Sequence, residues 1–380
     1  ILDVSDNAGN TNQKSATTNS SSVTKVENAE VLTIIGSSDS QKIGKDLVGS
    51  GRGIEAYSIN YDGSIIAYTW QSSSSYFTVN VYQFNNATGD FDIKLGQDLT
   101  KTDSAYNNSS YGYTIALSGD GTTLIVGEYN YKQTASYTDE GRAMVYKYNS
   151  SSNNWDDYGQ TLIGTENYMD FGRRVNISHD GTIIAVGATQ TDVDSGHDGL
   201  SDGFTSAEGI IRIFQYNSTS SQWDTQDTIY GEVDPATNIA NGYTGYTMAL
   251  SADGTVFVSG EWFTKEYNGY QYGEKALIYK YDGTTWNLRD TIESPFTYDT
   301  SNQRRFGSSI ALSGDGNTLA VGMQRSWDDT TDSHANVVSL YEYNATDTSW
   351  NSIGSITGPY ASALLGNPST SLYTNYGLSL

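Results

Sequence analysis

The chain has 380 residues, with 44 acidic and 20 basic side chains and a formal net charge of −24. This negative charge repels nucleic-acid phosphates and anionic lipid headgroups, so we expect neither as a partner. No apolar run approaches 18 residues, so we expect no membrane insertion. Cysteine is absent, which excludes structural disulfides, thiolate metal sites and cysteine nucleophiles. With 39 Gly, 30 Tyr and only 4 Pro, and without useful helical periodicity, the composition predicts an all-β fold of short strands and tight turns.

The first segment differs from the rest of the chain. Residues 1–28 are rich in Ser, Thr, Asn and Ala, which predicts a flexible or extended N-terminal arm. Residues 31–49 follow and resemble the end of a repeated unit, with a third strand and then a fourth that ends in Leu-Val-Gly. We assign residues 29–380 to the repeat domain that the following patterns describe.

One phrase then recurs: a strand, an Asp-Gly turn and a second strand. It is written YGYTIALSGDGTTLIVG (111–127), FGRRVNISHDGTIIAVG (171–187), TGYTMALSADGTVFVSG (244–260) and FGSSIALSGDGNTLAVG (306–322). The Asp-Gly turn of this phrase falls at positions 62, 120, 180, 253 and 315, so the spacings are 58, 60, 73 and 62 residues. Asp-Gly between alternating apolar residues predicts a hairpin with a type I′ turn, which needs positive φ at both central positions.

Each hairpin is followed by a third strand, an aromatic residue and a short fourth strand. The third strands alternate in polarity, as in AMVYKYN (143–149), so one face of each is buried. The aromatic positions, which we expect to pack the units together rather than to bind a ligand, are Phe91, Trp155, Trp223, Trp286 and Trp350. The units start near residues 53, 111, 171, 244 and 306.

A four-stranded unit cannot bury both faces alone, whereas units packed face to face around an axis bury them all. The sequence therefore predicts a β-propeller of four-stranded antiparallel blades, with separate small β domains as the alternative. Residues 31–49 and 374–380 would share a closing blade, which makes six visible blades. A seventh would follow if the chain continues past Leu380.

The repeats also resemble a known family. FGSSIALSGDGNTLAVG, VVSLYEYN (337–344) and Trp350, with KLGQDL (94–99), YGQTLIG (158–164) and IGKDLVG (43–49), resemble the FG-GAP-like repeats of integrin-α-type β-propellers. The order and spacing of these phrases resemble those in repeat proteins of marine microbes, algae and their large viruses. The resemblance covers residues 31–380 and implies an extracellular or virion-surface protein that works in adhesion or assembly rather than catalysis.

Calcium is the cofactor that the sequence suggests. The family often carries an Asp-x-Asp-x-Asp-Gly calcium loop after the first strand, but this chain has a two-residue Asp-Gly hairpin there. A different loop, DVDSGHDGLSD (192–202), spaces carboxylates as Ca²⁺ ligands. The candidate ligands are Asp192, Asp194, Asp198 and Asp202, and a solvated acidic loop is the alternative.

A binding face is predicted just after the second strands, since equivalent positions gather on one rim of a propeller. Aromatic rings and carboxylates at these positions suit a glycan or a peptide. The candidates are Trp70, Glu128, Tyr129, Glu261 and Trp262. Packing between blades is the alternative interpretation, and a third is that Glu128 and Glu261 form an acid/base pair for glycoside cleavage.

Sequons of the form Asn-x-Ser/Thr recur just after the third strands. They start at Asn86, Asn149, Asn217 and Asn344. The pattern predicts a glycosylated outer rim in a secreted protein, although the preference of Asn for turns accounts for it equally well.

These patterns predict a non-enzymatic, extracellular or virion-surface β-propeller that serves adhesion or builds a filament, a coat or a surface layer. Its partners would be other protein subunits, including copies of itself, or surface glycans. The alternative is a polysaccharide-active or glycan-binding propeller with its site at the channel mouth.

Overall fold

A computed structural model describes the chain over fourteen ranges. These are residues 54–73, 76–101, 110–133, 139–165, 169–189, 209–231, 233–234, 239–240, 244–261, 266–267, 270–271, 274–295, 306–323 and 337–357. The chain divides into two units, Ile1–Lys45 and Asp46–Leu380, and every described residue belongs to the second. The predicted arm (1–28) and the predicted closing blade (31–49 with 374–380) lie outside these ranges. Within them no helix is long and apolar enough to span a membrane.

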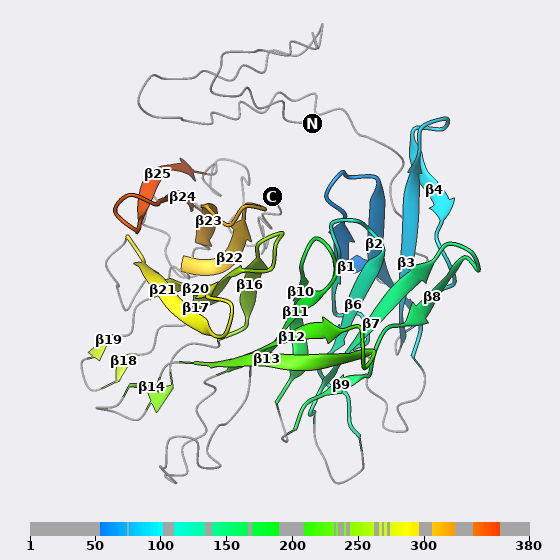
Figure 1. Ribbon diagram of the computed structural model, residues 1–380, viewed down its shortest axis with the longest axis horizontal. Helices are drawn as coiled ribbons and strands as arrows, with labels where there is room; N and C mark the ends of the chain where they lie inside the picture. Colours follow the sequence, from blue (N-terminus) through cyan, green and yellow to red (C-terminus); the bar gives the residue numbers. More distant parts are fainter. Residues whose placement is uncertain are drawn as a thin grey trace, which may run out of the picture. The chain divides into compact units, whose positions relative to one another are not determined.

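Five sheets, each built on a path of four antiparallel strands, make up most of the described chain (Figure 1). We call them blades 1 to 5. Blade 1 holds β1 (Ile54–Ile59), β2 (Ile65–Ser73), β3 (Tyr76–Asn85) and β4 (Asp90–Lys94), and blade 2 holds β5 (Thr114–Leu117), β6 (Thr123–Glu128), β7 (Arg142–Asn149) and β8 (Asn154–Asp157), with β9 (Leu162–Ile163) also paired to β7.

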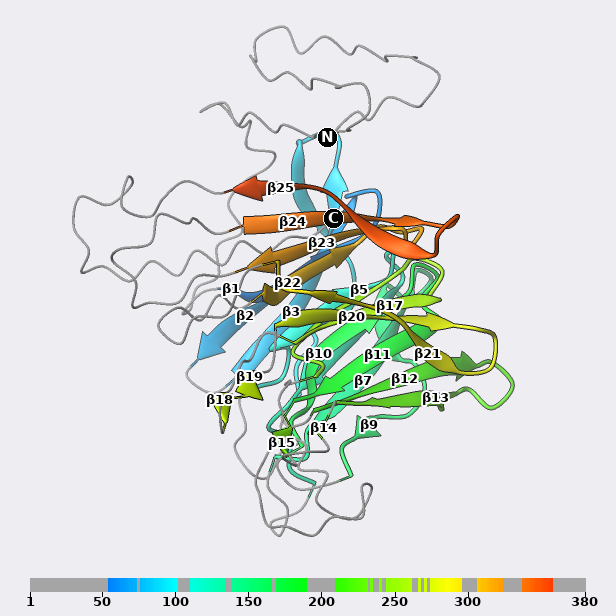
Figure 2. The same ribbon diagram turned by 90° about the vertical axis from the view of Figure 1, so that its left-hand side faces the viewer.

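Blade 3 holds β10 (Phe171–Ile177), β11 (Ile183–Ala188), β12 (Ile210–Asn217) and β13 (Gln222–Tyr230). Blade 4 holds β16 (Thr247–Leu250), β17 (Val256–Glu261), β20 (Lys275–Tyr281) and β21 (Trp286–Glu293). Blade 5 holds β22 (Phe306–Leu312), β23 (Thr318–Met323), β24 (Val337–Asn344) and β25 (Ser349–Thr357), which lie side by side in Figure 2. Two short hairpins pair β14 (Val233–Asp234) with β15 (Ile239–Ala240), and β18 (Glu266–Tyr267) with β19 (Tyr270–Gln271).

The hydrophobic cores lie between consecutive blades. Four clusters of buried side chains are each shared by two neighbouring blades, from blades 1 and 2 to blades 4 and 5. The first strands of the blades contact one another in chain order, β1 with β5, β5 with β10, β10 with β16 and β16 with β22. Four-stranded meanders that bury their faces against the next meander are the architecture of a β-propeller, so the predicted fold class is confirmed, while the count of six blades stays a prediction.

The Asp-Gly hairpins are confirmed, but the predicted type I′ turn is wrong. Only the glycine of each pair has positive φ, as in Gly121 at 73°. Its amide donates to the carbonyl oxygen of Ser118 at 2.9 Å, which makes Asp-Gly the third and fourth residues of a longer turn. Asp120 Oδ1 then accepts from the amide of Thr122 at 2.8 Å, so the aspartate is selected as an acceptor and the glycine for its left-handed backbone.

These turns also join one blade to the next through backbone hydrogen bonds. The amide of Asp120 donates to the carbonyl oxygen of His179 at 3.1 Å. The amide of His179 donates to Ala252 at 2.9 Å, and that of Ala252 donates to Gly314, also at 2.9 Å. The same short turn therefore closes the inner hairpin of its own blade and is hydrogen-bonded to the corresponding turn of the next blade.

At the other end of the first strands, glycine pairs bring the blades into main-chain contact. The second strand of one blade meets the start of the next first strand at three boundaries, Gly127 with Gly172, Gly187 with Gly245, and Gly260 with Gly307. A Cβ on the first glycine of each pair would lie 2.1, 2.5 and 2.2 Å from the carbonyl oxygen of the second. Glycine therefore recurs at these positions because no side chain fits between the two backbones.

The repeated tryptophans connect each blade to the preceding one. Trp155 Nε1 donates to the carbonyl oxygen of Leu95 at 2.9 Å, and Trp223 Nε1 donates to that of Tyr158 at 2.7 Å. Trp286 Nε1 donates to Gln226 Oε1 at 3.0 Å. These indoles are 2, 2 and 7 % exposed in chain order, so they pack between blades as predicted.

Trp350 breaks this pattern, because its Nε1 is buried with no hydrogen-bond partner. Gln226, three residues after Trp223, is the acceptor for the next tryptophan, and the corresponding residue after Trp286 is Arg289. A guanidinium group cannot accept a hydrogen bond. Arg289 instead lies over the ring of Tyr343, 3.4 Å from its centroid.

The glycine contacts predict a large cost for one methyl group. We expect Gly127→Ala to lower the free energy of unfolding by about 3 kcal/mol, because the Cβ meets a main-chain carbonyl that cannot rotate away. The matched control is Gly314→Ala, whose Cβ would lie 3.3 Å from the Ala252 side chain. Chemical denaturation followed by circular dichroism measures both, and equal midpoints would contradict the proposed packing constraint.

The tryptophan contacts predict unequal effects of one substitution at equivalent positions. Trp155→Phe leaves the Leu95 carbonyl unpaired, whereas Trp350→Phe removes a donor that has no partner. Both lose the same volume, so we expect Trp155→Phe to cost about 1–2 kcal/mol more than Trp350→Phe. The same denaturation experiment compares them, and a larger loss for Trp350→Phe would show that the indole bonds do not hold the blades together.

Candidate functional site

Four of the residues predicted to form a binding face are described, and they lie at the second-strand ends of blades 1, 2 and 4. Trp70 is half-buried, and its Nε1 donates to the side-chain oxygen of Asn80 at 2.6 Å, while the Asn80 amide donates to Asp98 at 2.7 Å. Tyr129 is half-buried at the end of β6, next to buried Glu128. Trp262 lies outside the described residues.

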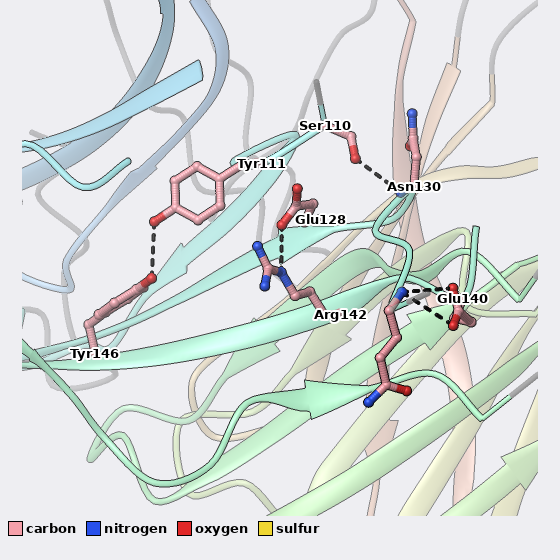
Figure 3. A network of polar contacts seen from close by, with 8 residues as sticks. Ser110, Tyr111, Glu128, Asn130, Glu140, Arg142 and Tyr146 are labelled. Atoms are coloured by element: carbon pink, nitrogen blue, oxygen red, sulfur yellow. Dashed lines mark hydrogen bonds and ion pairs between the residues drawn. The ribbon is translucent and has the colours of Figure 1, made fainter. Parts of the chain in front are cut away.

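Glu128 forms a buried ion pair inside blade 2 (Figure 3). Its Oε2 lies 2.6 Å from Arg142 Nε, and the two side chains are 2 and 5 % exposed. Arg142 also lies over the ring of Tyr131, 3.8 Å from its centroid. Beside the pair, Tyr111 and Tyr146 share a buried hydrogen bond of 3.1 Å, and burial raises the pKa of Tyr111 well above its usual value.

Glu261 repeats this arrangement in blade 4. Its Oε2 lies 3.5 Å from Lys275 Nζ, and its Oε1 accepts from Thr244 Oγ1 at 2.7 Å. In each ion pair, the glutamate on the second strand is the direct cross-strand neighbour of the basic residue on the third strand. At this register, blades 3 and 5 place apolar pairs, Ala188 with Ile210 and Met323 with Val337.

This alternation assigns the position to packing within a blade. Glu128 and Glu261 belong to blades 2 and 4, with blade 3 between them, and each carboxylate is already engaged by a cation. A general acid and base for glycoside cleavage must instead flank one bond from the same cavity. Each glutamate is therefore engaged within its own blade, and the acid/base interpretation stays an untested prediction.

The predicted calcium ligands Asp192, Asp194, Asp198 and Asp202 all lie outside the described residues. Within the described ranges, no group of three or more His, Cys, Asp or Glu side chains is arranged to hold a metal ion. Calcium therefore stays a prediction for the 192–202 loop.

The predicted glycosylation sites lie where the third strands end, and Asn217 is half-buried whereas Asn86, Asn149 and Asn344 are exposed. Asn149 Oδ1 accepts from the amide of Ser151 at 3.1 Å, and Asn217 Oδ1 accepts from that of Thr219 at 2.9 Å. Asn344 Oδ1 accepts the equivalent hydrogen bond from the amide of Thr346. In blade 1 the acceptor is Asn85, which directly precedes the sequon residue Asn86. These turns give Asn a structural reason to recur, and glycosylation stays a prediction.

A different cluster, of arginine and tyrosine, forms where three first strands begin. Arg173 and Arg174 follow the Phe-Gly pair of β10, at a break in its register with β11. The guanidinium of Arg173 lies 4.5 Å from the ring centroid of Tyr129 and 5.6 Å from that of Tyr113. That of Arg174 lies 5.7 Å from Tyr113 and 5.0 Å from Tyr246. We call these five residues and Asp170 the Arg–Tyr cluster.

The cluster has more donors than acceptors. Arg173 Nη1 donates to Asp170 Oδ2 at 3.1 Å, and Arg174 Nη1 donates to the carbonyl oxygen of Arg173 at 3.1 Å. Arg173 Nε is buried and has no hydrogen-bond partner. In the described part of the chain, Asp170 is the one carboxylate within 4.0 Å of either guanidinium. The cluster is therefore an electropositive position in an acidic protein.

Burial controls the protonation of the other groups in the cluster. It raises the pKa of Asp170 to about 6, although the charge of Arg173 opposes this. Burial also raises the pKa of Tyr129, so its hydroxyl keeps its proton and can donate. What the arrangement can do is bind an oxyanion, since guanidinium groups held against aromatic rings are oriented for such ligands.

The sequence contained a signal for this cluster. Where β10 has Arg173-Arg174, the other phrases have Tyr113-Thr114, Tyr246-Thr247 and Ser308-Ser309. The arginine pair is therefore a departure from the repeat. The ends of the second strands were aligned in the sequence, so Tyr129 is the one member of the cluster that was predicted. The starts of the first strands, where the other members lie, were not compared.

Comparisons with known proteins give only distant similarity. No family model and no curated protein match the chain. Similar solved structures include a functionally unknown Desulfotomaculum acetoxidans protein (10% identity, TM-score 0.48, covering 82% of this chain and 72% of that one). A Bacteroides uniformis protein provisionally assigned as a 6-phosphogluconolactonase has 11% identity, TM-score 0.44 and coverages of 80% and 85%. A Lactobacillus plantarum protein has 12% identity, TM-score 0.43 and coverages of 87% and 89%.

The buried ion pair predicts a strong dependence of each partner on the other. Glu128→Ala leaves Arg142 buried without its carboxylate, and we expect it to cost about 3–5 kcal/mol of unfolding free energy. The double variant Glu128→Ala, Arg142→Ile copies the apolar pair of blade 3, and we expect it to recover most of that loss. Denaturation midpoints of the two variants test this, and equal losses would rule out a packing role for the pair.

Proposed function

We propose that the chain is a non-catalytic β-propeller that works in adhesion outside the cell and recognises acidic sugars through the Arg–Tyr cluster. The observation that carries the proposal is the pair of adjacent guanidinium groups between tyrosine rings of blades 2 and 4, where the described residues place one carboxylate, Asp170, within ion-pair distance. The group recognised is an oxyanion, a carboxylate or a sulfate ester, on a sugar ring.

The net charge decides what kind of anion suits the cluster. A charge of −24 repels long polyanions, whose many charges extend well beyond one site. Screening at physiological salt limits this repulsion to about 8 Å, so a small local cationic site still attracts one anionic group. A glycan with isolated acidic residues therefore fits better than nucleic acid or a densely sulfated polymer.

The tyrosines favour a sugar as the carrier of that group. Aromatic rings stack on the apolar faces of sugar rings, and a protonated phenol donates to ring hydroxyls. Tyr113, Tyr129 and Tyr246 all contact the arginines and are half-buried, so they keep exposed surface. Two tyrosines come from blade 2 and one from blade 4, so one ligand would contact several blades.

The described residues also support a role without catalysis. The two glutamates at equivalent second-strand ends, Glu128 and Glu261, are buried in ion pairs of separate blades. The Arg–Tyr cluster supplies binding groups and one carboxylate that is already bound to Arg173. Recognition needs only these groups, whereas hydrolysis needs a second positioned acid or base.

Binding of small acidic sugars tests the proposal. We expect methyl glucuronide and glucose 6-sulfate, but not methyl glucoside, to bind the wild-type protein in NMR titrations. Arg174→Ala removes a guanidinium and should weaken binding about tenfold or more, because a hydrogen bond to a charged group contributes about 1.5–3 kcal/mol. The two acidic sugars distinguish carboxylate from sulfate recognition.

The matched control is Arg289→Ala, which removes an arginine from another tyrosine ring, that of Tyr343 in blade 5. This variant should bind like the wild type. Equal binding of the neutral and acidic sugars, or equal losses in Arg174→Ala and Arg289→Ala, would overturn the proposed function.

A further inference from the structure

We propose that Asp170 is an internal competitor for the acidic ligand: its carboxylate occupies Arg173, and removing its charge opens a second anion position beside Arg174. This inference rests on the proposed function, and it names the residue that sets how many anionic groups the site accepts. At neutral pH the site would offer Arg174 to one oxyanion. With Asp170 neutral it would offer both guanidinium groups.

The contact between Asp170 and Arg173 is a partial one. A single hydrogen bond of 3.1 Å joins Asp170 Oδ2 to Arg173 Nη1, and Arg173 Nε has no partner. An arginine and a carboxylate that face each other squarely make two parallel hydrogen bonds. Asp170 therefore neutralises the charge of Arg173 while leaving its remaining donors unused.

The backbone fixes Asp170 in this place. Its φ is 53°, in the left-handed region, and its amide donates to the carbonyl oxygen of Asp139 at 3.1 Å. Asp and Asn are the residues other than Gly that adopt this region most readily. Asp170→Asn therefore keeps the backbone conformation and the shape of the side chain while removing its charge.

The surroundings make the charge of Asp170 easy to remove. Its side chain is 7 % exposed, and that of Arg173 is 20 % exposed. Asp139, before β7, adds a like charge that opposes ionisation, and Lys132 lies 3.8 Å from Asp139. Tyr129, at the end of β6, stays neutral. The backbone carbonyl oxygen of Glu140 accepts a hydrogen bond from the amide of Phe171.

The sign of the pH effect follows from these groups. Burial raises the pKa of Asp170 to about 6, so the carboxylate is charged at pH 7.5 and neutral at pH 5. Protonation releases Arg173, so binding of an anion strengthens as the pH falls through about 6. A sulfate ester is ionised across this range, so glucose 6-sulfate reports the protein's titration alone.

The test measures glucose 6-sulfate affinity by calorimetry at pH 7.5 and pH 5.0 in intact wild-type protein and three variants. We expect wild-type affinity to rise about tenfold on acidification, the contribution of one charge-assisted hydrogen bond. Asp170→Asn should bind about tenfold more tightly than wild type at pH 7.5 and vary little with pH. Arg173→Ala should lose the pH dependence and keep weak binding through Arg174.

A matched control removes one negative charge elsewhere. Asp157→Asn lies at an exposed position on β8 and changes the net charge by the same amount, so it should behave like the wild type at both pH values. Binding by Asp170→Asn that equals the wild type at pH 7.5, or a pH dependence that survives in Arg173→Ala, would overturn the competitor role. Absence of binding in every form, at both pH values, would instead overturn the proposed function and this inference with it.

Discussion

The structure depends on main-chain contact between glycines of consecutive blades. Gly127 meets Gly172, and Gly187 meets Gly245, at distances that leave no room for a Cβ. This contact fixes where the first strands of blades 3, 4 and 5 begin relative to the second strand of the blade before each. Hydrophobic burial supplies the larger stabilisation, but it is non-directional, whereas a glycine pair permits one register.

The same contact builds the candidate site. Tyr129 lies two residues after Gly127 and Arg173 one residue after Gly172, so the first glycine pair places that ring beside that guanidinium. Tyr246 directly follows Gly245, and the second pair places it beside Arg174. A repeat that exists for packing therefore holds functional side chains on rigid strands, and only the residues after the glycines need to vary.

The site also shows how charge is distributed in an acidic propeller. Aspartates in the inner turns accept hydrogen bonds from nearby hydroxyl and amide groups, which hold the pKa of Asp315 below its usual value. They stay charged and contribute to the net charge of −24. Asp170 is the opposite case, because burial raises its pKa to about 6. Two aspartates of one chain thus differ in role because of their surroundings.

Sequence reasoning predicted the parts of the fold that repeat. Strand order, the inner hairpins and the packing of Trp155 and Trp223 all follow from spacing and alternation, because each is local or recurs with every blade. The turn type was wrong because Asp-Gly pairs also close longer turns, in which only the glycine needs positive φ. Strand alternation alone could not show that Glu128 faces an arginine across the sheet.

The Arg–Tyr cluster was missed for a different reason, although its arginine pair departs from the repeat. Tyr113, Arg174 and Tyr246 are 61 and 72 residues apart, about one repeat each, and they meet only because first strands of three blades lie together. A pattern that is read one unit at a time shows each of them as an ordinary strand residue. Their meaning comes from the boundaries between blades, where the glycine contacts set the distances.

The most direct test of this account is a crystal structure of the protein with glucose 6-sulfate bound. We expect the sulfate oxygens to accept hydrogen bonds from Arg174, with the sugar ring against Tyr113 or Tyr246. Sugar density at another position, with Arg173 and Arg174 untouched, would contradict the assignment of the Arg–Tyr cluster as the recognition site.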